Sequence, residues 1–226
     1  MWQSAFKILL SGNNITRILG GLETTIVISL TSIVLGTLIG IVLGSLWTFS
    51  GKGIRLVFKI YLEIFRIIPT IPLLFLFYYI LPRNLGVNLP AVQVSILVFA
   101  LWFAAEFSDI IRGSIQSVPR QQKESALALG LSTFQIFRYV LIPQGLLIAL
   151  SPFINLSTRI IKTTSILLLI SVTDVITVGQ QIIEANSQNT VIPILIYGII
   201  ALLYWLVNAI LGYLTDYVEG KQINGQ

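Results

Sequence analysis

The sequence predicts an all-α integral membrane protein with five membrane-spanning helices. Of its 226 residues, 55% are hydrophobic and 10% are charged, and the mean hydropathy is +0.90. Soluble domains contain roughly 25% charged residues, so this chain is too apolar to be one. Its apolar residues form five runs, each long enough at about 1.5 Å per residue to cross about 30 Å of hydrocarbon. The absence of Cys and His excludes disulfides, Cys/His metal sites and imidazole or thiol catalysis.

The predicted segments follow one another along the chain. Residues 1–21 form an N-terminal interfacial segment, because the apolar run after Lys7 is too short for the core of a signal peptide. Residues 22–218 form the transmembrane domain, and residues 219–226 form a cytoplasmic tail. The predicted spans cover about 22–49, 60–81, 91–111, 144–172 and 191–214, with a cytoplasmic loop at 117–143.

The distribution of Lys and Arg predicts the orientation of these spans. Basic residues are concentrated in the loops on one side, at Lys52, Arg55, Lys59, Arg112, Arg120, Lys123 and Arg138. The segment 173–190, on the other side, contains acidic residues but no Lys or Arg. Because cytoplasmic loops are enriched in Lys and Arg, the N-terminus is expected outside and the C-terminus inside. Basic residues confined to short loops also argue against a nucleic-acid-binding surface.

Small residues in the first span predict a close helix contact. Gly36, Gly40 and Gly44 recur every four residues and therefore share one helix face. A face of this kind lets the backbone of another helix approach closely in a membrane. We interpret it as a packing surface.

The loop at 117–143 is predicted to contain two short helices around a corner. Ser117 is placed to cap the first helix, and Gly130 provides the permissive backbone for the corner. Ser132 and Gln135 have the spacing of a capping box at the start of the second helix, which Pro143 is expected to end. The segment fits either an amphipathic surface in the headgroup layer or a helix presented to a groove on a partner protein.

Charged residues inside the spans provide a second group of candidates. Glu63, Arg66 and Glu106 lie near the inner ends of the second and third spans. Because a charge is costly in lipid unless it faces protein or water, we expect interhelical pairs, such as Arg66 with Glu106.

The fourth span carries two cations whose role the sequence leaves open. Arg159 and Lys162 lie three residues apart, with Asn155 and Ser165 nearby. Such a face could line a water-accessible pathway and receive a carboxylate. Pairing with the acidic residues of the other spans would satisfy the same two cations.

Four motifs occur in a fixed order along these segments. They are Glu63-x-Phe65-Arg66 with Pro72-Leu73, Ala105-Glu106 with Arg112-Gly113, Glu124-Ser125-Ala126 with Gly130 and Ile142-Pro143-Gln144, and Asn155 with Lys162, Thr164 and Ser165. Together they resemble permease subunits of ATP-binding-cassette (ABC) importers, in the polar amino acid uptake family of MetI-like permeases. The resemblance covers about residues 21–217. Two departures are Ser125, where the family has Ala, and Thr163, where it has the Asp that follows Lys162.

The resemblance implies a type I importer permease fold that forms half of the pathway for a polar amino acid. It implies that the loop is the coupling-helix pair, with ATPase-coupling residues Glu124, Ser125, Ala126, Gly130 and Pro143. We expect Asn155, Arg159, Lys162 and Ser165 to line the pathway. The implied partners are two ABC ATPase subunits, a second identical or homologous permease and an extracytoplasmic amino-acid-binding protein. The implied location is a bacterial inner membrane.

The chain is not expected to be an enzyme or to bind a cofactor. It contains no GxxxxGK[ST] phosphate loop, so ATP is expected to be used by a partner subunit. Two other functions remain open, a self-sufficient secondary transporter or channel and a membrane anchor for a cytoplasmic partner. A betaine-type osmolyte is the alternative substrate.

Overall fold

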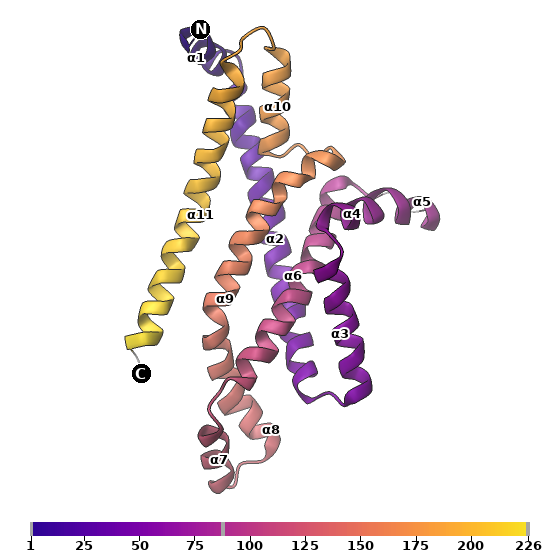
Figure 1. Ribbon diagram of the computed structural model, residues 1–226, viewed down its shortest axis with the longest axis vertical. Helices are drawn as coiled ribbons and strands as arrows, with labels where there is room; N and C mark the ends of the chain where they lie inside the picture. The colour runs from indigo at the N-terminus through magenta and orange to yellow at the C-terminus, as the bar shows by residue number, and fades with distance from the viewer. Residues whose placement is uncertain (1, 87–88, 225–226) are drawn as a thin grey trace. The chain divides into compact units, whose positions relative to one another are not determined.

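The computed structural model describes residues 2–86 and 89–224, and all regular structure in this part of the chain is helical (Figure 1). The all-α prediction is therefore confirmed for these residues. Residues 87–88, between the second and third predicted spans, and residues 225–226 of the predicted tail lie outside the described residues. The helices are α1 (Trp2–Leu10), α2 (Asn14–Phe49), α3 (Lys52–Ile67), α4 (Thr70–Phe75), α5 (Leu81–Leu85), α6 (Ala91–Gln116), α7 (Arg120–Ala128), α8 (Thr133–Ile136), α9 (Ile142–Thr163), α10 (Val175–Ala185) and α11 (Ile192–Asn224). Three tighter or wider turns continue them, the π-helical η1 (Leu76–Ile80) and η2 (Phe137–Leu141) and the 3₁₀-helical η3 (Thr164–Ile170).

Four continuous helical stretches in the described residues are long and apolar enough to cross a membrane, and a bent pair makes a possible fifth. The four are Asn14–Thr48, Ala91–Gln116, Thr133–Ile170 and Ile192–Tyr217. The pair is Lys52–Ile67 with Thr70–Asn84, bent by 104°. The bend follows from the sequence, because Pro69 disfavours helical backbone at the residue before it, and Ile68 is extended with φ −74° and ψ 121°. The second predicted span is thus not one straight helix.

The chain divides into two compact units that alternate along the sequence. Unit 1 contains Met1–Ser32, Thr70–Phe99 and Thr158–Tyr213. Unit 2 contains Ile33–Pro69, Ala100–Ser157 and Leu214–Gln226.

Unit 1 has a core of aliphatic residues from α1, α2, α10 and α11. Figure 1 shows α1 and α10 beside the N-terminal part of α11. The buried members of this core are Ala5, Ile18, Val175, Val178, Ile182, Ile192, Ile196 and Ile200. Polar contacts at the same end join α2 to α10, where Arg17 Nη2 donates to Gln181 Oε1 at 2.6 Å.

Unit 2 is built on close contact between α2 and α6. A Cβ atom added at Gly36 would lie 2.7 Å from Phe103 Cβ, and one at Gly44 would lie 2.5 Å from the Ser108 carbonyl oxygen. Gly40 faces Phe107 on the next turn. The predicted packing face is therefore confirmed, since any side chain larger than hydrogen would separate the two backbones.

Candidate functional site

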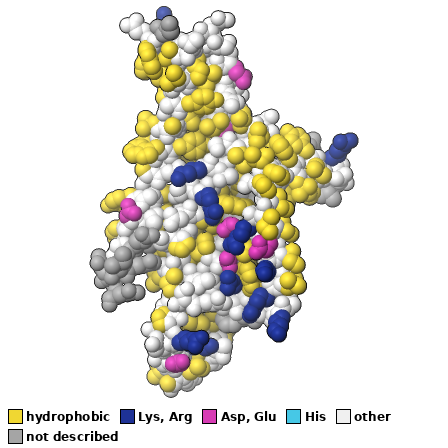
Figure 2. All heavy atoms as spheres, in the orientation of Figure 1, with side chains coloured by type: hydrophobic (Ala, Val, Ile, Leu, Met, Phe, Trp, Pro, Cys, Tyr) yellow, Lys and Arg dark blue, Asp and Glu magenta, His cyan; other side chains and the backbone are white. Residues whose placement is uncertain are grey.

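A network of charged side chains joins α3 to α6 in unit 2. Figure 2 shows Lys, Arg, Asp and Glu side chains gathered over α3 and the neighbouring part of α6. Arg66 Nε lies 3.8 Å from Glu106 Oε1, and Arg66 Nη2 lies 3.2 Å from Asp109 Oδ2. Arg112 Nη2 contacts the other oxygen of Asp109 at 2.5 Å. Asp109 therefore bridges two guanidinium groups and links the two helices.

Two further contacts fix Arg112 in this network. Its Nη1 donates to Gln116 Oε1 at 3.0 Å, and its Cζ lies 4.9 Å from the centre of the Trp47 ring. Such a stacked cation is stabilised by the ring quadrupole. The network is thus held from α2, α3 and α6.

The structure brings together Arg66 and Glu106 but not Glu63. The Glu63 carboxylate makes no ion pair within the described residues and lies on an apolar groove along α3, together with Ile60 and Ile67. Asp109, the residue that makes the shorter contact with Arg66, was missing from the predicted site. Its signal was present, because Asp109 lies three residues after Glu106 and three before Arg112, on the same helix face.

Lys162 and Ser165 line a shallow cavity of about 310 Å³ in unit 1, which is open at the surface. The opposite walls are Ile176 of α10 and Tyr197, Ile200, Ala201 and Tyr204 of α11. Neither Asn155 nor Arg159 lines this cavity, although positions 155, 159 and 162 share one exposed stripe of α9. Asn155 falls in unit 2 and Arg159 in unit 1.

The cavity includes two tyrosines that sequence reasoning missed. Tyr197 and Tyr204 are seven residues apart and so lie on one face of α11. That spacing is the only local signal, because the residues they face on α9 and η3 are more than 30 positions away in the sequence.

Asp174, between η3 and α10, is a further polar residue of unit 1 that was missed. Its side chain is 0% exposed, whereas the sequence suggested an outer loop. It caps α10, because Asp174 Oδ1 accepts from Thr177 N at 2.9 Å and from Thr177 Oγ1 at 2.6 Å. Asp174 Oδ2 is buried and has no hydrogen-bond partner in the described part of the chain. Burial raises the pKa of the Asp174 carboxyl, and the Thr177 hydrogen bonds act in the opposite direction.

The corner between α7 and α8 is closed by backbone geometry. Gly130 has φ +80°, the left-handed conformation that favours glycine. The Gly130 N–H donates to the Leu127 carbonyl at 2.9 Å, and the Leu131 N–H donates to the Ala126 carbonyl at 3.1 Å. These two bonds form a Schellman motif, so the corner at Gly130 has the predicted geometry.

The second helix of the corner begins with the predicted capping box. The Gln135 N–H donates to Ser132 Oγ at 3.3 Å, and the Ser132 N–H donates to Gln135 Oε1 at 2.8 Å. This prediction is confirmed.

Two predicted helix boundaries in the loop are wrong. Ser117 does not cap α7, because its Oγ donates backward to the Gly113 carbonyl at 2.9 Å and Pro119 occupies the cap position. Pro143 does not end the second helix, which continues through η2 into α9. The π-helical turn η2 widens the backbone just before the proline and shifts the hydrogen-bond pattern there, so a residue without an N–H is accepted at the second position of α9.

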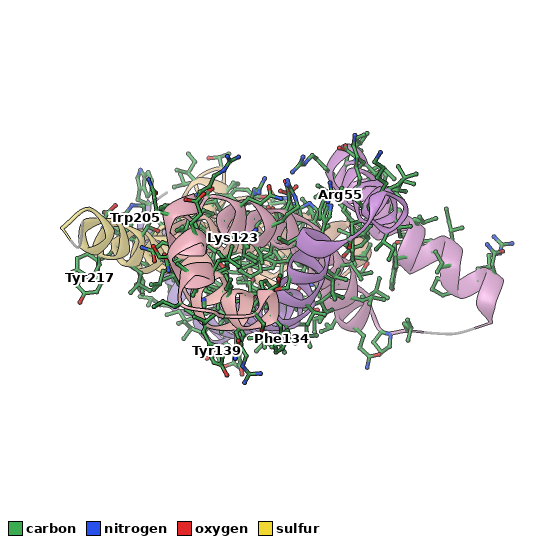
Figure 3. All side chains as sticks on the ribbon, turned by 90° about the horizontal axis from the view of Figure 1, so that it is seen from below. Arg55, Lys123, Phe134, Tyr139, Trp205 and Tyr217 are labelled. Atoms are coloured by element: carbon green, nitrogen blue, oxygen red, sulfur yellow. The ribbon has the colours of Figure 1, made fainter. Side chains whose placement is uncertain are left out.

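The corner exposes a group of apolar side chains, which we call the corner patch. Its members are Leu127, Leu129, Phe134 and Tyr139, which are 50%, 81%, 69% and 65% exposed. Figure 3 shows Phe134 and Tyr139 pointing outward from this end of the chain. Large exposed apolar side chains gathered in one short segment are typical of interaction surfaces.

The residues of the predicted coupling motif lie beside the corner patch. Glu124 and Ser125 are exposed on α7, and Ala126 is buried beneath them. Gly130 forms the corner itself, whereas Pro143 lies in the first turn of α9, beyond η2. The structure thus brings four of these five residues together at one turn.

Residues 16–224 match the family described as "Binding-protein-dependent transport system inner membrane component". The chain belongs to this family. It is 29% identical over 220 residues to the probable amino-acid ABC transporter permease protein YckA of Bacillus subtilis, covering 97% of this chain and 95% of the relative. It is 27% identical over 208 residues to the glutamine transport system permease protein GlnP of Escherichia coli, covering 92% and 93%.

Solved structures agree with the family. One described as an amino acid ABC transporter with histidines matches with a TM-score of 0.82 and 28% identity, covering 92% of this chain and 94% of the other. The inward-facing MetNI methionine ABC transporter matches with a TM-score of 0.75 at 18% identity, covering 92% and 99%, which supports the fold alone. The chain is therefore a MetI-like membrane permease component and not itself an enzyme.

Proposed function

We propose that this chain is the permease subunit of an ATP-driven importer and forms half of the pathway for a polar amino acid. The relatives support this proposal, because they are named as amino-acid permeases. The N-terminus lies outside, the C-terminus lies inside, and the membrane is a bacterial inner membrane. The partners are two ABC ATPase subunits, a second permease and an extracytoplasmic binding protein. The chain itself binds no cofactor, and ATP is used by the ATPase subunits.

The corner patch is the observation that carries the coupling role. It presents four exposed apolar side chains next to Glu124 on a turn whose shape is fixed by Gly130 and by the capping box. A rigid, partly apolar helix end suits a groove on a soluble partner. Lys162 lies further along the helical stretch Thr133–Ile170 that begins at this corner. Movement of the ATPase would thus be transmitted to the pathway side chains in an alternating-access cycle.

The pathway role rests on the exposed stripe of Asn155, Arg159 and Lys162 on α9, followed by Ser165 on η3. Polar and charged side chains in a membrane span mark substrate pathways when they face water. Alternating exposure of this stripe to the two sides of the membrane would move the substrate across.

The coupling proposal is tested with the reconstituted importer in proteoliposomes. Replacing Phe134 or Leu129 with Ala should weaken ATPase binding about tenfold, because buried apolar anchors dominate interface energies. ATP-dependent uptake should fall in parallel. Tyr213→Ala is the matched control, since Tyr213 is a 73% exposed aromatic residue of α11 in unit 1 and does not belong to the corner patch.

The results separate this proposal from its two alternatives. Uptake by the chain alone, without an ATPase, would instead establish a secondary transporter or channel. Weakened ATPase binding with undiminished uptake would indicate a membrane anchor. Uptake of a betaine but not of an amino acid would show that the substrate is a betaine-type osmolyte.

A further inference from the structure

A stripe of cations runs along the first half of α3. Lys52, Arg55 and Lys59 are three and four residues apart, so they share one helix face, and all three are exposed. Figure 2 shows basic side chains gathered over this helix. None of the three makes an ion pair within the described residues, whereas the cations of the charged network described above do. Arg55 Nη2 donates to the Ser50 carbonyl at 3.1 Å, which leaves its other N–H groups available to an anion.

An apolar groove of about 410 Å³ lies beside this stripe on α3. Its apolar walls are Leu56, Ile60, Ile64, Ile67 and Ile68. Leu56 and Ile60 each follow a cation of the stripe by one residue, so the groove lies on the neighbouring face of the helix. All five apolar side chains are exposed in this chain. The groove can therefore accept an apolar chain from another molecule.

The length of α3 fits the depth of one membrane leaflet. The basic loop at its start is predicted to be cytoplasmic, and the helix ends at Ile67, just before the bend at Pro69. From Lys59 to Ile67 the helix rises about 12 Å, at about 1.5 Å per residue. Half of a hydrocarbon core of about 30 Å is about 15 Å. A lipid whose phosphate lies at Lys59 would therefore have its acyl chain alongside the groove.

We propose that the stripe and the groove of α3 together bind an anionic phospholipid of the inner leaflet. Arg55 and Lys59, one helical turn apart, hold the phosphate, and an acyl chain lies along Ile60, Ile64 and Ile67. Arginine suits this role because its guanidinium can donate two parallel N–H groups to one phosphate. A zwitterionic lipid fits less well, since the same cations repel its quaternary ammonium. A soluble acidic peptide would match the stripe alone and leave the groove uncovered.

Glu63 is the acidic residue among those that line the groove. It lies one turn beyond Lys59, nearer the bend, and makes no ion pair in the described part of the chain. A phosphate at Lys59 would therefore lie close to a second negative charge, which weakens its binding. Neutralising Glu63 should accordingly strengthen lipid binding, an effect opposite in sign to the loss of a cation.

The test is native mass spectrometry of the purified chain, alone and assembled with its ATPase. The probes are phosphatidylglycerol, phosphatidylcholine with the same acyl chains, and glycerophosphoglycerol, which has no acyl chain. Phosphatidylglycerol should bind at least about tenfold more tightly than phosphatidylcholine, and glycerophosphoglycerol should not compete with it. Arg55→Gln with Lys59→Gln should weaken phosphatidylglycerol binding by roughly 10- to 30-fold. Lys7→Gln with Arg83→Gln removes the same two charges from exposed positions outside the groove and should leave binding unchanged.

Two single variants separate the site from a general loss of structure. Glu63→Gln should strengthen phosphatidylglycerol binding roughly two- to fivefold, whereas a disrupted fold would weaken it. Ile64→Asn places a polar amide in the groove and should weaken both lipids alike, because it acts on the acyl chain. Ile210→Asn, at an exposed isoleucine of α11 outside the groove, is the matched control.

The proposal is overturned if phosphatidylcholine binds as tightly as phosphatidylglycerol, or if the variant lacking both Arg55 and Lys59 binds phosphatidylglycerol normally. Competition by glycerophosphoglycerol would mean that α3 binds a soluble phosphate and not a lipid, which also overturns it. Lipid binding that is present in the isolated chain but absent from the assembled complex would show that a partner protein covers α3. That result would overturn the proposal as well.

Discussion

The two units treat polar groups in opposite ways. In unit 2, Asp109 is shared between Arg66 and Arg112, and α2 packs against α6 through a row of glycines. Unit 1 contains Asp174 Oδ2 and Asn208 Oδ1, two buried oxygens that have no hydrogen-bond partner in the described residues. It also contains the Lys162 ammonium, which faces a cavity rather than an acid.

This difference separates structural support from binding capacity. Charges that neutralise one another hold helices together but offer little to a ligand. A cation left beside a cavity adds little to folding and is available to bind an anion. We therefore interpret the charged network of unit 2 as structural, and we propose that Lys162 of unit 1 contributes to the pathway.

The largest difference in stability is expected for a substitution at Gly44, in the contact between α2 and α6. Gly44→Leu would place side-chain atoms where Ser108 and Ile111 of α6 already lie. Overpacking costs about 1–3 kcal/mol in soluble proteins, and contact with backbone puts this variant at about 3 kcal/mol. A loss of that size lowers Tm by roughly 6–12 °C for a chain of this length. Fluorescence-detected thermal unfolding of the purified chain measures it.

A glycine of unit 1 serves as the control for this prediction. Gly198 lies within α11, and a Cβ atom there would meet nothing within 4 Å. Gly198→Leu should leave Tm within about 2 °C of the wild type, since surface substitutions away from such contacts change stability by about 0.5 kcal/mol or less. Equal losses in both variants would remove the distinction between the units.

The next largest effect is expected at Asp109. Asp109→Asn removes the anion shared by Arg66 and Arg112, although Glu106 remains 3.8 Å from Arg66. Hydrogen bonds to charged groups contribute about 1.5–3 kcal/mol, and partial exposure of the three side chains puts the expected loss near 1.5 kcal/mol. Thermal unfolding should show it as a decrease of roughly 3–6 °C in Tm.

Glu63→Gln is the matched control, because it neutralises an acid of α3 that makes no ion pair in the described part of the chain. Its expected change in Tm is small. The double variant Asp109→Asn with Arg112→Gln should lose less stability than the sum of the losses in the two single variants. A loss larger than that sum would mean that the network does not act by pairing these charges.

Much of unit 2 could be predicted from the sequence, because its signals are local. The spacing of Gly36, Gly40 and Gly44 indicated a close helix contact, and Ser132 with Gln135 indicated a capping box. Both kinds of signal depend on residues three or four apart on one helix. The sequence failed there at Pro143, where the neighbouring backbone of η2 accommodates the proline, and at Asp109, which was left out of the predicted charged pair.

The polar features of unit 1 could not be predicted in this way. Lys162 faces Tyr197 and Tyr204 across 35 or more positions of sequence, and periodicity carries no information about such a pairing. Asp174 stood in a polar stretch that resembled an exposed loop, yet η3 and α10 bury it. Which side of a membrane protein a polar residue faces is decided by the packing of other helices.

Substitution of Asp174 is expected to have a smaller effect, and it should increase the stability of the folded chain. Burial raises the pKa of its carboxyl, so the folded state binds a proton more readily than the unfolded state. The stability this group contributes is present below its unfolded pKa and is lost as pH rises through the folded value. Asp174→Asn keeps an acceptor for Thr177 and removes the charge, so it should raise Tm at pH 7.5 by roughly 2–4 °C, or about 1 kcal/mol.

The pH dependence distinguishes this explanation from a general packing effect. The difference in Tm between Asp174→Asn and the wild type should shrink as the pH is lowered through the raised pKa of the folded-state carboxyl. Glu184→Gln, which neutralises an exposed acid at the end of the same helix, is the matched control. A variant that is less stable at every pH would mean that the charged carboxylate is itself required.

The smallest effect is expected at the corner in unit 2, where the exposed backbone N–H groups of Ser132 and Gln135 are hydrogen-bonded in the capping box. Ser132→Ala removes the side-chain acceptor for the Gln135 N–H, and loss of a helix cap costs about 1 kcal/mol. Because α8 is short and exposed, the loss should appear as about fivefold faster hydrogen exchange at Gln135 and Ile136, with Tm almost unchanged. Ser117→Ala is the control, since Ser117 donates to the Gly113 carbonyl and caps nothing. If both serine variants accelerate exchange at α8 equally, the capping box does not stabilise the corner. The contrast between paired polar groups in unit 2 and unpaired polar groups in unit 1 would then be limited to the charged network.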